Sequence, residues 1–445
     1  MTKATPARSL ALGVLLAVDR DGAYGSLALQ KAQLPQRELR FATELVYGTL
    51  RERSLLDWWL ERGTGKKVAQ LTPSVRSNLR LALYQCAFLD SVPQRAAVDQ
   101  AVELARKFSP KAAKFVNWAL RATFRQKEPF ALPPKEDPLF YLSTRFSHPS
   151  WLVELWLEQL GEEATGKLLE ANQKQAPLII RTNTLATTPE KLALTLLEEG
   201  IETVPCSFVP EALQVKCGRP VASAAFGRGL FLIQSEASQL VSHLLAPKAG
   251  ERVLDLAAAP GGKTTHLAQL MENKGEIIAC DLHPHRVELI EENCQRLGIE
   301  IVETICADGR EIRGKVEGLF EKVLLDAPCS GLGVMRGKPD LRWHKTPQEL
   351  SALPPLQLEL LEAAASVIAP GGELCYSTCT INRSENQDLV ADFLATHPSF
   401  QPLSLAERLP EGAKQLKLLA DNMLQLLPWE HGLDGFFFAL FKRIS

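Results

Sequence analysis

This sequence has no hydrophobic run approaching the ~20 residues of a membrane-spanning helix, and its first residues lack the apolar segment of a signal peptide. We therefore expect a cytoplasmic protein without a membrane partner. The nine cysteines include no C-x-x-C pair, and no His/Cys cluster has the spacing of zinc ligands. We accordingly expect no bound metal. An odd number of irregularly spaced cysteines fits a reducing compartment.

The length and composition are those of a soluble protein with several domains. At 445 residues the chain exceeds what one hydrophobic core supports, and its hydrophobic content of 46% is ordinary for a globular protein. Residues 1–145 carry more Lys and Arg than Asp and Glu, whereas the remainder of the chain is net acidic. Cations are dense in residues 51–67 and 106–114. This clustering favours a nucleic-acid partner over the alternative of solvated helix faces.

Periodicity predicts three domains and a linker. Residues 1–128 repeat apolar side chains at helical spacing throughout and predict an all-α bundle. Residues 129–145 begin with a proline-rich stretch and form the linker. Residues 146–235 alternate short strands with helices, which is typical of a small α+β domain with a four-stranded ferredoxin-like or RRM-like sheet.

Residues 236–445 alternate strand and helix and predict a C-terminal α/β domain with a Rossmann-like, doubly wound sheet of seven strands. Two of the seven are expected over residues 424–427 and 436–441, as a hairpin at the sheet edge. The ends of the other five are expected at Asp255, Asp281, Cys306, Asp326 and Cys379. Ligands of such folds bind beyond the carboxyl ends of the strands, so these ends are where a site is expected.

The stretch R-V-L-D-L-A-A-A-P-G-G-K-T-T at residues 252–265 predicts a buried strand, a glycine turn and a helix that begins near Lys263. Such a unit presents backbone N–H groups and the positive end of a helix to a nucleotide or nucleoside. A P-loop is one interpretation, but Ala257 stands where its first glycine belongs. The S-adenosylmethionine (AdoMet) turn of a methyltransferase is the other. It requires acidic residues after the next strands, and Asp281 and Asp308 are there. We favour AdoMet.

Two cysteines follow strand ends on the predicted ligand side, Cys329 in D-A-P-C-S-G and Cys379 in S-T-C-T. A thiolate that adds to carbon 6 of a pyrimidine makes carbon 5 nucleophilic enough to attack the AdoMet methyl group. The thiolate needs a nearby cation, for which Lys263 is the candidate. Asp326 either caps a turn or bonds the exocyclic amine or a protonated ring nitrogen of cytosine. This chemistry alone does not rank the two cysteines.

Four other cysteines fit positions of buried small hydrophobic residues, namely Cys280, Cys294, Cys306 and Cys375.

Several motifs carry a resemblance to a known family. D-L-A-A-A-P-G-G-K-T-T-H-L-A, D-A-P-C-S-G, M-R-G-K-P-D-L-R-W at residues 335–343 and Y-S-T-C-T resemble the NOL1/NOP2/Sun family of RNA cytosine-5 methyltransferases. The N-terminal helices, with K-F-V-N-W-A-L-R at residues 114–121, look like a NusB-like RNA-binding domain. The resemblance therefore covers the whole chain. Within the family, this fusion is similar to the bacterial enzymes that methylate 16S ribosomal RNA.

The resemblance implies an AdoMet-dependent enzyme that methylates carbon 5 of a cytosine in 16S ribosomal RNA. It implies that Cys379 is the nucleophile and that Cys329 assists release of the product, with Asp326 and Lys263 beside them. The cofactor residues that it implies are Ala257, Ala258, Ala259, Pro260, Gly261, Gly262, Lys263, Asp281, Asp308 and Asp326. The stretch Gln234-Ser235-Glu236 departs from the common Gln-Asp-Glu form, and Ala257 replaces a frequent Cys. The alternatives are the same chemistry on tRNA and a non-catalytic RNA-binding factor.

Overall fold

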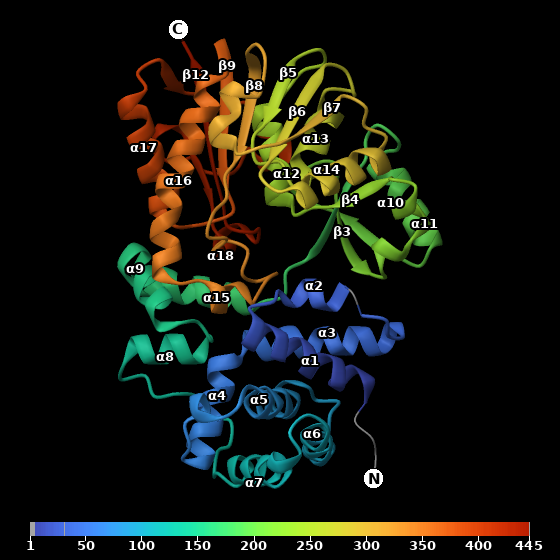
Figure 1. The fold of residues 1–445 in the computed structure, drawn as a ribbon, viewed down its shortest axis with the longest axis vertical. Coiled ribbons are helices and arrows are strands. Elements are labelled where there is room, and N and C mark those ends of the chain that lie inside the picture. The colour runs from blue at the N-terminus through green and yellow to red at the C-terminus, as the bar shows by residue number, and fades with distance from the viewer. Residues whose placement is uncertain (1–4, 31, 445) are drawn as a thin grey trace. The chain divides into compact units, whose positions relative to one another are not determined.

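A computed structural model describes residues 5–30 and 32–444 (Figure 1). Contacts divide the chain into two compact units. The helical unit comprises Met1–Lys174 and Lys338–Lys345, and the sheet unit comprises Gln175–Gly337 and Thr346–Ser445. The domain boundaries predicted at residues 128, 145 and 235 are finer than this division and stay predictions. Among the described residues, no helix has both the length and the apolar character needed to cross a bilayer.

The helical unit confirms the predicted all-α bundle. Its hydrophobic core includes leucines from five helices that are almost completely buried, namely Leu12, Leu45, Leu56, Leu79 and Leu104. Its helices are α1 (Pro6–Asp21), α2 (Gly25–Gln30), α3 (Gln36–Arg51), α4 (Arg53–Thr64), α5 (Pro73–Phe88), α6 (Gln94–Phe108), α7 (Ala113–Phe124), α8 (Pro138–Arg145), α9 (Ser150–Gln173) and α15 (Leu341–His344). Helix α9 kinks at Gly161, whose backbone is non-helical, and continues to Gln173.

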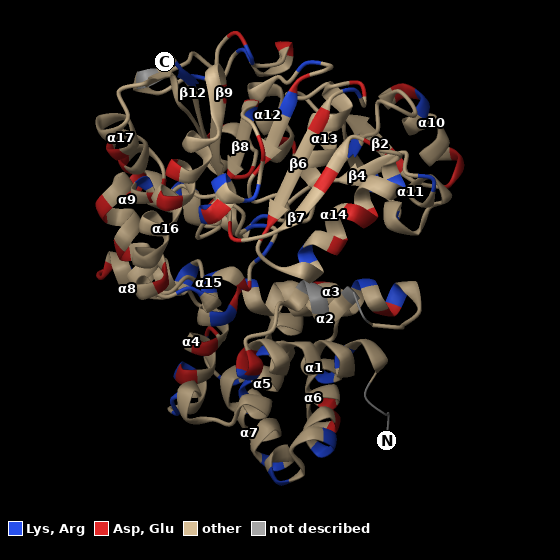
Figure 2. Cartoon of the chain, turned by 45° about the horizontal axis from the view of Figure 1, so that its top comes forward, with Lys and Arg blue, Asp and Glu red and all other residues tan. Residues whose placement is uncertain are grey.

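Part of the basic character of this unit is internal. Asp19 is an ion-pair partner of Arg53, Arg76 and Arg80, and Arg80 also pairs with Asp57. Arg53 belongs to the cation cluster of residues 51–67 that the sequence analysis singled out. This arginine therefore forms an ion pair inside the bundle. The cations of residues 106–114 are exposed, at the turn between α6 and α7 (Figure 2).

A segment from the C-terminal half of the sequence, Lys338–Lys345, packs within the helical unit. The Asp340 carboxylate accepts a hydrogen bond from Gly25 N at 2.9 Å. Arg342 is fully buried, and its guanidinium donates to the carbonyls of Ser147 and Asn172, both at 3.2 Å. Trp343 Nε1 donates to the carbonyl of a residue in α3 at 3.0 Å. The second half of the motif at residues 335–343 is therefore a structural part of the helical unit.

The smaller sheet of the sheet unit has the predicted four strands, with the order β2-β3-β1-β4 and antiparallel neighbours throughout. Its core contains Ile180, Leu192, Leu196, Leu213 and Phe231. The elements are β1 (Leu178–Thr182), α10 (Pro189–Glu198), β2 (Glu202–Pro205), β3 (Ala212–Cys217), α11 (Ala224–Gly227) and β4 (Phe231–Ile233). The ferredoxin-like expectation is confirmed.

The larger sheet runs β10-β12-β9-β8-β5-β6-β7, and β11 also pairs with β12. The strands β9, β8, β5, β6 and β7 are parallel, whereas β12 is antiparallel to its neighbours. The strands are β5 (Arg252–Asp255), β6 (Glu276–Asp281), β7 (Val302–Cys306), β8 (Phe320–Asp326), β9 (Ile368–Thr378), β10 (Phe400–Pro402), β11 (Leu424–Leu426) and β12 (Phe436–Arg443). The sheet has eight strands rather than the predicted seven. The sequence did not predict β10, because three residues are too few to show the alternation of a strand.

Helices cover both faces of this sheet, as in a doubly wound fold (Figure 1). Val253 packs with α12 (Glu236–Leu245), α13 (Gly262–Leu270) and α14 (Pro284–Leu297) in one hydrophobic cluster. The next residue, Leu254, packs on the opposite face with α16 (Pro347–Ser366) and α17 (Gln387–Thr396). A short helix, α18 (Pro428–His431), joins β11 and β12. Because both faces are buried, the strands read as nearly continuous apolar runs.

Candidate active site

The glycine turn lies between β5 and α13, as predicted. Gly261 has φ of +90°, and a side chain there would lie 3.1 Å from the backbone of Ile290. As the N-cap of α13, it supplies no side-chain hydrogen bond to the first turn of the helix. The N–H groups of that turn are thus left to water or a ligand, at the positive end of the helix. At the start of the turn, Asp255 accepts Thr264 Oγ1 at 2.7 Å, and burial raises its pKa to about 7.

Asp281 lies against the glycine turn, where the sequence placed it. Its Oδ2 accepts Ala259 N at 3.2 Å, and its Oδ1 accepts His283 N at 3.3 Å. The side chain is buried at the carboxyl end of β6. These two hydrogen bonds fix the carboxylate beside the turn, so the end of β6 and the glycine turn form one side of the site.

Asp308 follows β7, but its carboxylate is already engaged. The Arg310 guanidinium donates to both of its oxygens, at 2.6 Å to Oδ2 and 3.0 Å to Oδ1, and also donates to Glu359 at 3.0 Å. The hydrogen bonds from Arg310 hold the pKa of Asp308 below its usual value. A ligand that uses this carboxylate shares it with Arg310.

Lys263 and Asp326 meet between the glycine turn and the cysteines. Lys263 Nζ donates to Asp326 Oδ2 at 2.6 Å, and Ser377 Oγ donates to Asp326 Oδ1 at 2.7 Å. The Lys263 side chain is 13% exposed and also lies over the Phe436 ring. Burial opposes its charge, but Asp326 and then Cys379 outweigh burial and raise the pKa of Lys263. The lysine is therefore a firmly protonated cation.

The two predicted cysteines face each other across neighbouring strand ends. Cys329 lies in the loop after β8 and Cys379 follows β9, and their Sγ atoms are 3.3 Å apart. The hydrogen bond with Cys379 and then burial raise the pKa of Cys329 well above that of a free thiol. One thiol of the pair thus stays protonated, while the other lies near the Lys263 cation.

The remaining cysteines of the C-terminal domain divide into two kinds. Cys280, Cys294 and Cys375 are buried, as predicted, and burial raises their pKa values to about 12, 11 and 12. Cys306 is exposed, so its assignment to a buried position is wrong. It lies at the end of β7, which is an edge strand of the sheet.

The stretch Gln234-Ser235-Glu236 has structural partners. Ser235 caps α12, and Glu236 accepts the backbone N–H groups of two residues before β3. Gln234 accepts a hydrogen bond from Arg181 at 2.5 Å. Sequence reasoning missed Arg181, which is fully buried in β1 and braces the start of α13 through Thr265 Oγ1 at 2.9 Å and the Gly262 carbonyl. The available sequence signal was a single arginine within the largely apolar strand L-I-I-R-T at residues 178–182.

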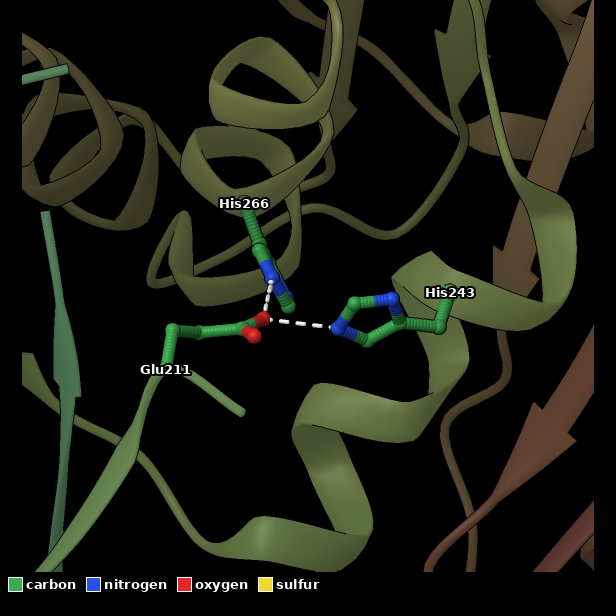
Figure 3. Close-up of side chains that lie close together, drawn as sticks. All are labelled: Glu211, His243 and His266. Carbon is green, nitrogen blue, oxygen red and sulfur yellow. Dashed lines mark hydrogen bonds and ion pairs between the residues drawn. The ribbon is translucent and has the colours of Figure 1, made fainter. Parts of the chain in front are cut away.

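A second cluster in the sheet unit consists of Glu211, His243 and His266 (Figure 3). Glu211 Oε1 lies 2.5 Å from His266 Nε2 and 2.7 Å from His243 Nε2. Two ligands of a tetrahedral zinc ion lie about 3.3 Å apart, since each is about 2.0–2.1 Å from the metal. The shorter separations are those of hydrogen bonds. Moreover, Nδ1 of His266 is buried and has no hydrogen-bond partner among the residues that the structure describes, whereas ligating histidines usually donate their second N–H.

We assign this cluster as a hydrogen-bonded clamp. Burial lowers the pKa of His266 to about 3, so the ring is neutral and donates its Nε2–H. Burial opposes the charge on Glu211, but the bonds from His243 and His266 outweigh it and lower the pKa of the carboxyl. The clamp joins the start of β3 to α12 and α13, and so supports the helix that carries Lys263.

The fold and this site together define a Rossmann-like methyltransferase: a parallel sheet with an antiparallel strand inserted beside β9, a glycine turn after β5, and acidic residues after the following strands. Residues 242–442 match a family described as 16S rRNA methyltransferase RsmB/F, residues 5–125 match the NusB family, and residues 148–222 match the ferredoxin-like domain of RsmF/B-like methyltransferases. The chain belongs to the RsmB/F family, and its helical N-terminal domain is NusB-like, as predicted.

Known proteins resemble this chain over most or all of its length. A probable ribosomal RNA small subunit methyltransferase B of Bacillus subtilis is 38% identical, over 99% of both chains. The crystal structure of the protein designated PH0851 has a TM-score of 0.83 and 31% identity, over 100% of both chains. The structure of NSun6 from Pyrococcus horikoshii with SFG has a TM-score of 0.59 and 25% identity, over 67% of this chain and 98% of that one.

Proposed function

We propose that this protein transfers the methyl group of AdoMet to carbon 5 of a cytosine in 16S ribosomal RNA, through a covalent adduct of Cys379 with carbon 6. The observation that carries the proposal is the pair of cysteine sulfurs 3.3 Å apart, beside the ion pair of Lys263 and Asp326. Amino-group methylation requires no nucleophile from the protein, because an amine is already nucleophilic. Two thiols and a cation at the strand ends fit the harder reaction at carbon.

AdoMet is the cofactor of this proposal, and the residues present fit it. Residues 257–263 supply the turn, with the N-terminus of α13 behind it. Asp281 takes the ribose hydroxyls, and Asp308 lies after the next strand, on the side where the adenine is expected. The family relationship supports the same cofactor, since NSun6 was solved with SFG, an AdoMet analogue. AdoMet supplies an electrophilic methyl group, and a side chain of this chain forms and breaks the bond to carbon 6.

Cys379 begins the reaction as a thiolate stabilised by Lys263. Its sulfur bonds to carbon 6, and the electron pair of the ring double bond moves to carbon 5, which takes the methyl group. A base then removes the carbon 5 proton, and the double bond re-forms as the Cys379 sulfur leaves. Cys329, 3.3 Å away, assists this release. Asp326 holds the exocyclic amine or a protonated ring nitrogen of the cytosine.

Ribosomal RNA is the substrate class that the relatives favour, since the Bacillus subtilis relative is named as a probable small-subunit ribosomal RNA methyltransferase. The NusB-like domain, with exposed cations at the turn between α6 and α7, fits the role of an RNA-binding domain. The target cytosine must leave its stack to reach a thiol at a strand end.

Denaturing electrophoresis of wild type, Cys329→Ala and Cys379→Ala after incubation with AdoMet and 16S RNA tests this proposal. An RNA-shifted band that survives denaturation with Cys329→Ala and is missing with Cys379→Ala is the expected result. The reverse pattern makes Cys329 the nucleophile. Replacement of 16S RNA by tRNA in parallel lanes separates the two RNA classes. If no lane shows an adduct and wild type incorporates no methyl group into either RNA, the proposal is wrong.

A further inference from the structure

A buried carboxylate lies behind the two cysteines and has no role in the reaction as described so far. Glu385 ends the short helix Arg383–Glu385 and is 0% exposed. Its Oε2 accepts Ser330 N at 2.8 Å and Gln357 Nε2 at 3.0 Å. Its Oε1 accepts Ser330 Oγ at 2.5 Å and Asn382 Nδ2 at 3.0 Å. Among the described residues, no Lys, Arg or His forms an ion pair with it.

A carboxylate buried without a counter-charge is costly unless hydrogen bonds replace the lost water. Here four donors do so, and their positions in the sequence are informative. Ser330 directly follows Cys329, and its Oγ also lies 2.7 Å from Oγ1 of Thr380, which directly follows Cys379. The carboxylate and these two hydroxyls therefore connect the loops that carry the two thiols.

The backbone of Glu385 is itself fixed, so the connection has a rigid base. Tyr376, in the buried part of β9, donates its hydroxyl to the Glu385 carbonyl at 2.7 Å. Gln357 of α16 contacts the Glu385 carboxylate and also donates to the Pro328 carbonyl at 2.9 Å. Strand β9, helix α16 and both cysteine loops thus meet at one residue.

We propose that Glu385 is a positioning residue that ties the Cys329 loop to the Cys379 loop and so sets the separation of the two sulfurs for release of the methylated product. This inference rests on the proposed function, in which both thiols act on one base. Reaction rates fall steeply when catalytic groups are displaced by about 1 Å. A connection between two loops that are 50 residues apart would prevent such a displacement.

The charge of Glu385 acts in the same direction as its geometry. After the bond with Cys379, burial and the Cys379 charge, Glu385 is a further cause of the raised pKa of Cys329. Its carboxylate therefore helps to keep Cys329 protonated while Cys379, near Lys263, is the thiolate. Glu385 thus both positions the two thiols and favours the protonated form of Cys329.

The separation of the sulfurs can be tested without RNA or AdoMet. Dibromobimane becomes strongly fluorescent when it bridges two close thiols, and the part of the signal that Cys329→Ala removes reports on this pair. We expect Glu385→Gln, which replaces an acceptor oxygen by a donor, to lower that part at least fivefold. Glu236→Gln is the matched control, because Glu236 is also a buried carboxylate bound by backbone N–H groups, and its thiol neighbour is Cys206, whose cross-linking does not depend on Cys329 and so is not counted. It should cross-link like wild type.

The reaction gives the second readout. Glu385→Gln should accumulate the denaturation-resistant RNA adduct, as Cys329→Ala does, while its Kd for AdoMet stays within twofold of wild type. Ser330→Ala, which removes only the hydroxyl link, should give a smaller change of the same kind and serves if Glu385→Gln does not fold. Wild-type cross-linking and wild-type adduct release in the folded variants would overturn the proposal. Loss of cross-linking in Glu385→Gln with no RNA adduct in any protein would retain the tie and reject the covalent mechanism.

Discussion

The glycine turn after β5 and the loops after β8 and β9 lie at the same edge of one sheet, but they are built differently. In the first region, residues 255–262 with Asp281, the ligand would meet backbone N–H groups and a carboxylate, and glycine is needed at residue 261 for its positive φ. In the second, the cysteine region, which comprises residues 326–330 and 377–385 with Lys263, side chains hold one another through a partly buried hydrogen-bond network.

This difference indicates a division of labour. Backbone groups bind a ligand without titrating or reacting, which suits a cofactor that must enter and leave. The cysteine region needs a thiolate and a thiol 3.3 Å apart, so it requires a cation near one and a fixed spacing between both. Substitutions in the cysteine region should therefore abolish chemistry and spare AdoMet affinity, whereas substitutions in the glycine-turn region should do the reverse.

The strongest effect is expected for Cys379→Ala. Because no other group takes over the bond to carbon 6, methyl transfer should fall to background, while the Kd for AdoMet in calorimetry stays within twofold. The exposed thiol of Cys306 offers a matched control, and Cys306→Ala should keep wild-type turnover. Measurable turnover by Cys379→Ala would reject the assignment of the nucleophile.

Lys263→Met should lower turnover by roughly 10²–10⁴-fold, the range lost with a group that controls a protonation state. Without the cation, the thiolate is less favoured, so the pH at which half of Cys379 reacts with iodoacetamide should move upward. The alkylation profile is best measured in a Cys329→Ala background. An unmoved profile would show that Lys263 does not stabilise the thiolate.

Asp281→Asn should act mainly on the cofactor. A hydrogen bond to a charged group contributes about 1.5–3 kcal/mol, so the Kd for AdoMet should rise roughly 10–100-fold. At saturating AdoMet, kcat should change little, because the cysteines are untouched. A loss of kcat with an unchanged Kd would break the proposed division between the two regions.

Asp308→Asn should weaken AdoMet binding by only a few-fold. This carboxylate is only 27% exposed but is already shared with the exposed Arg310, and surface charge pairs contribute about 0–1 kcal/mol. Calorimetry on Asp281→Asn and Asp308→Asn side by side checks the order. A larger loss for Asp308→Asn would mean that the ligand displaces Arg310 to take the carboxylate fully.

The smallest effect on chemistry is expected far from both regions. Replacement of Lys107, Lys111 and Lys114 by Gln should leave kcat unchanged and weaken RNA binding at low salt. If each lysine neutralises one phosphate, the slope of log K against log salt should become shallower by about 2–3. Filter binding at several salt concentrations gives the slope, and an unaltered slope would place the RNA elsewhere on the helical unit.

Local patterns predicted the glycine turn, the acidic strand ends and both cysteine loops, because each is a short stretch whose residue types carry the chemistry. The sequence did not reveal the partners that arrive from a distance. Arg181 braces the start of α13 from β1, and Glu385 joins loops that are 50 residues apart. Periodicity records which face of an element is buried, not which polar group lies opposite it. For the same reason Arg53 was grouped with surface cations, although it pairs with Asp19.

The central claim is that the methyl group goes to carbon 5 of cytosine through a Cys379 adduct. Release of tritium from 16S RNA that carries [5-³H]cytosine tests it most directly. We predict that wild type releases one tritium for each methyl group transferred, only with AdoMet present, and that Cys379→Ala releases none. Methyl incorporation without tritium release would place the methyl group on another atom and contradict the account.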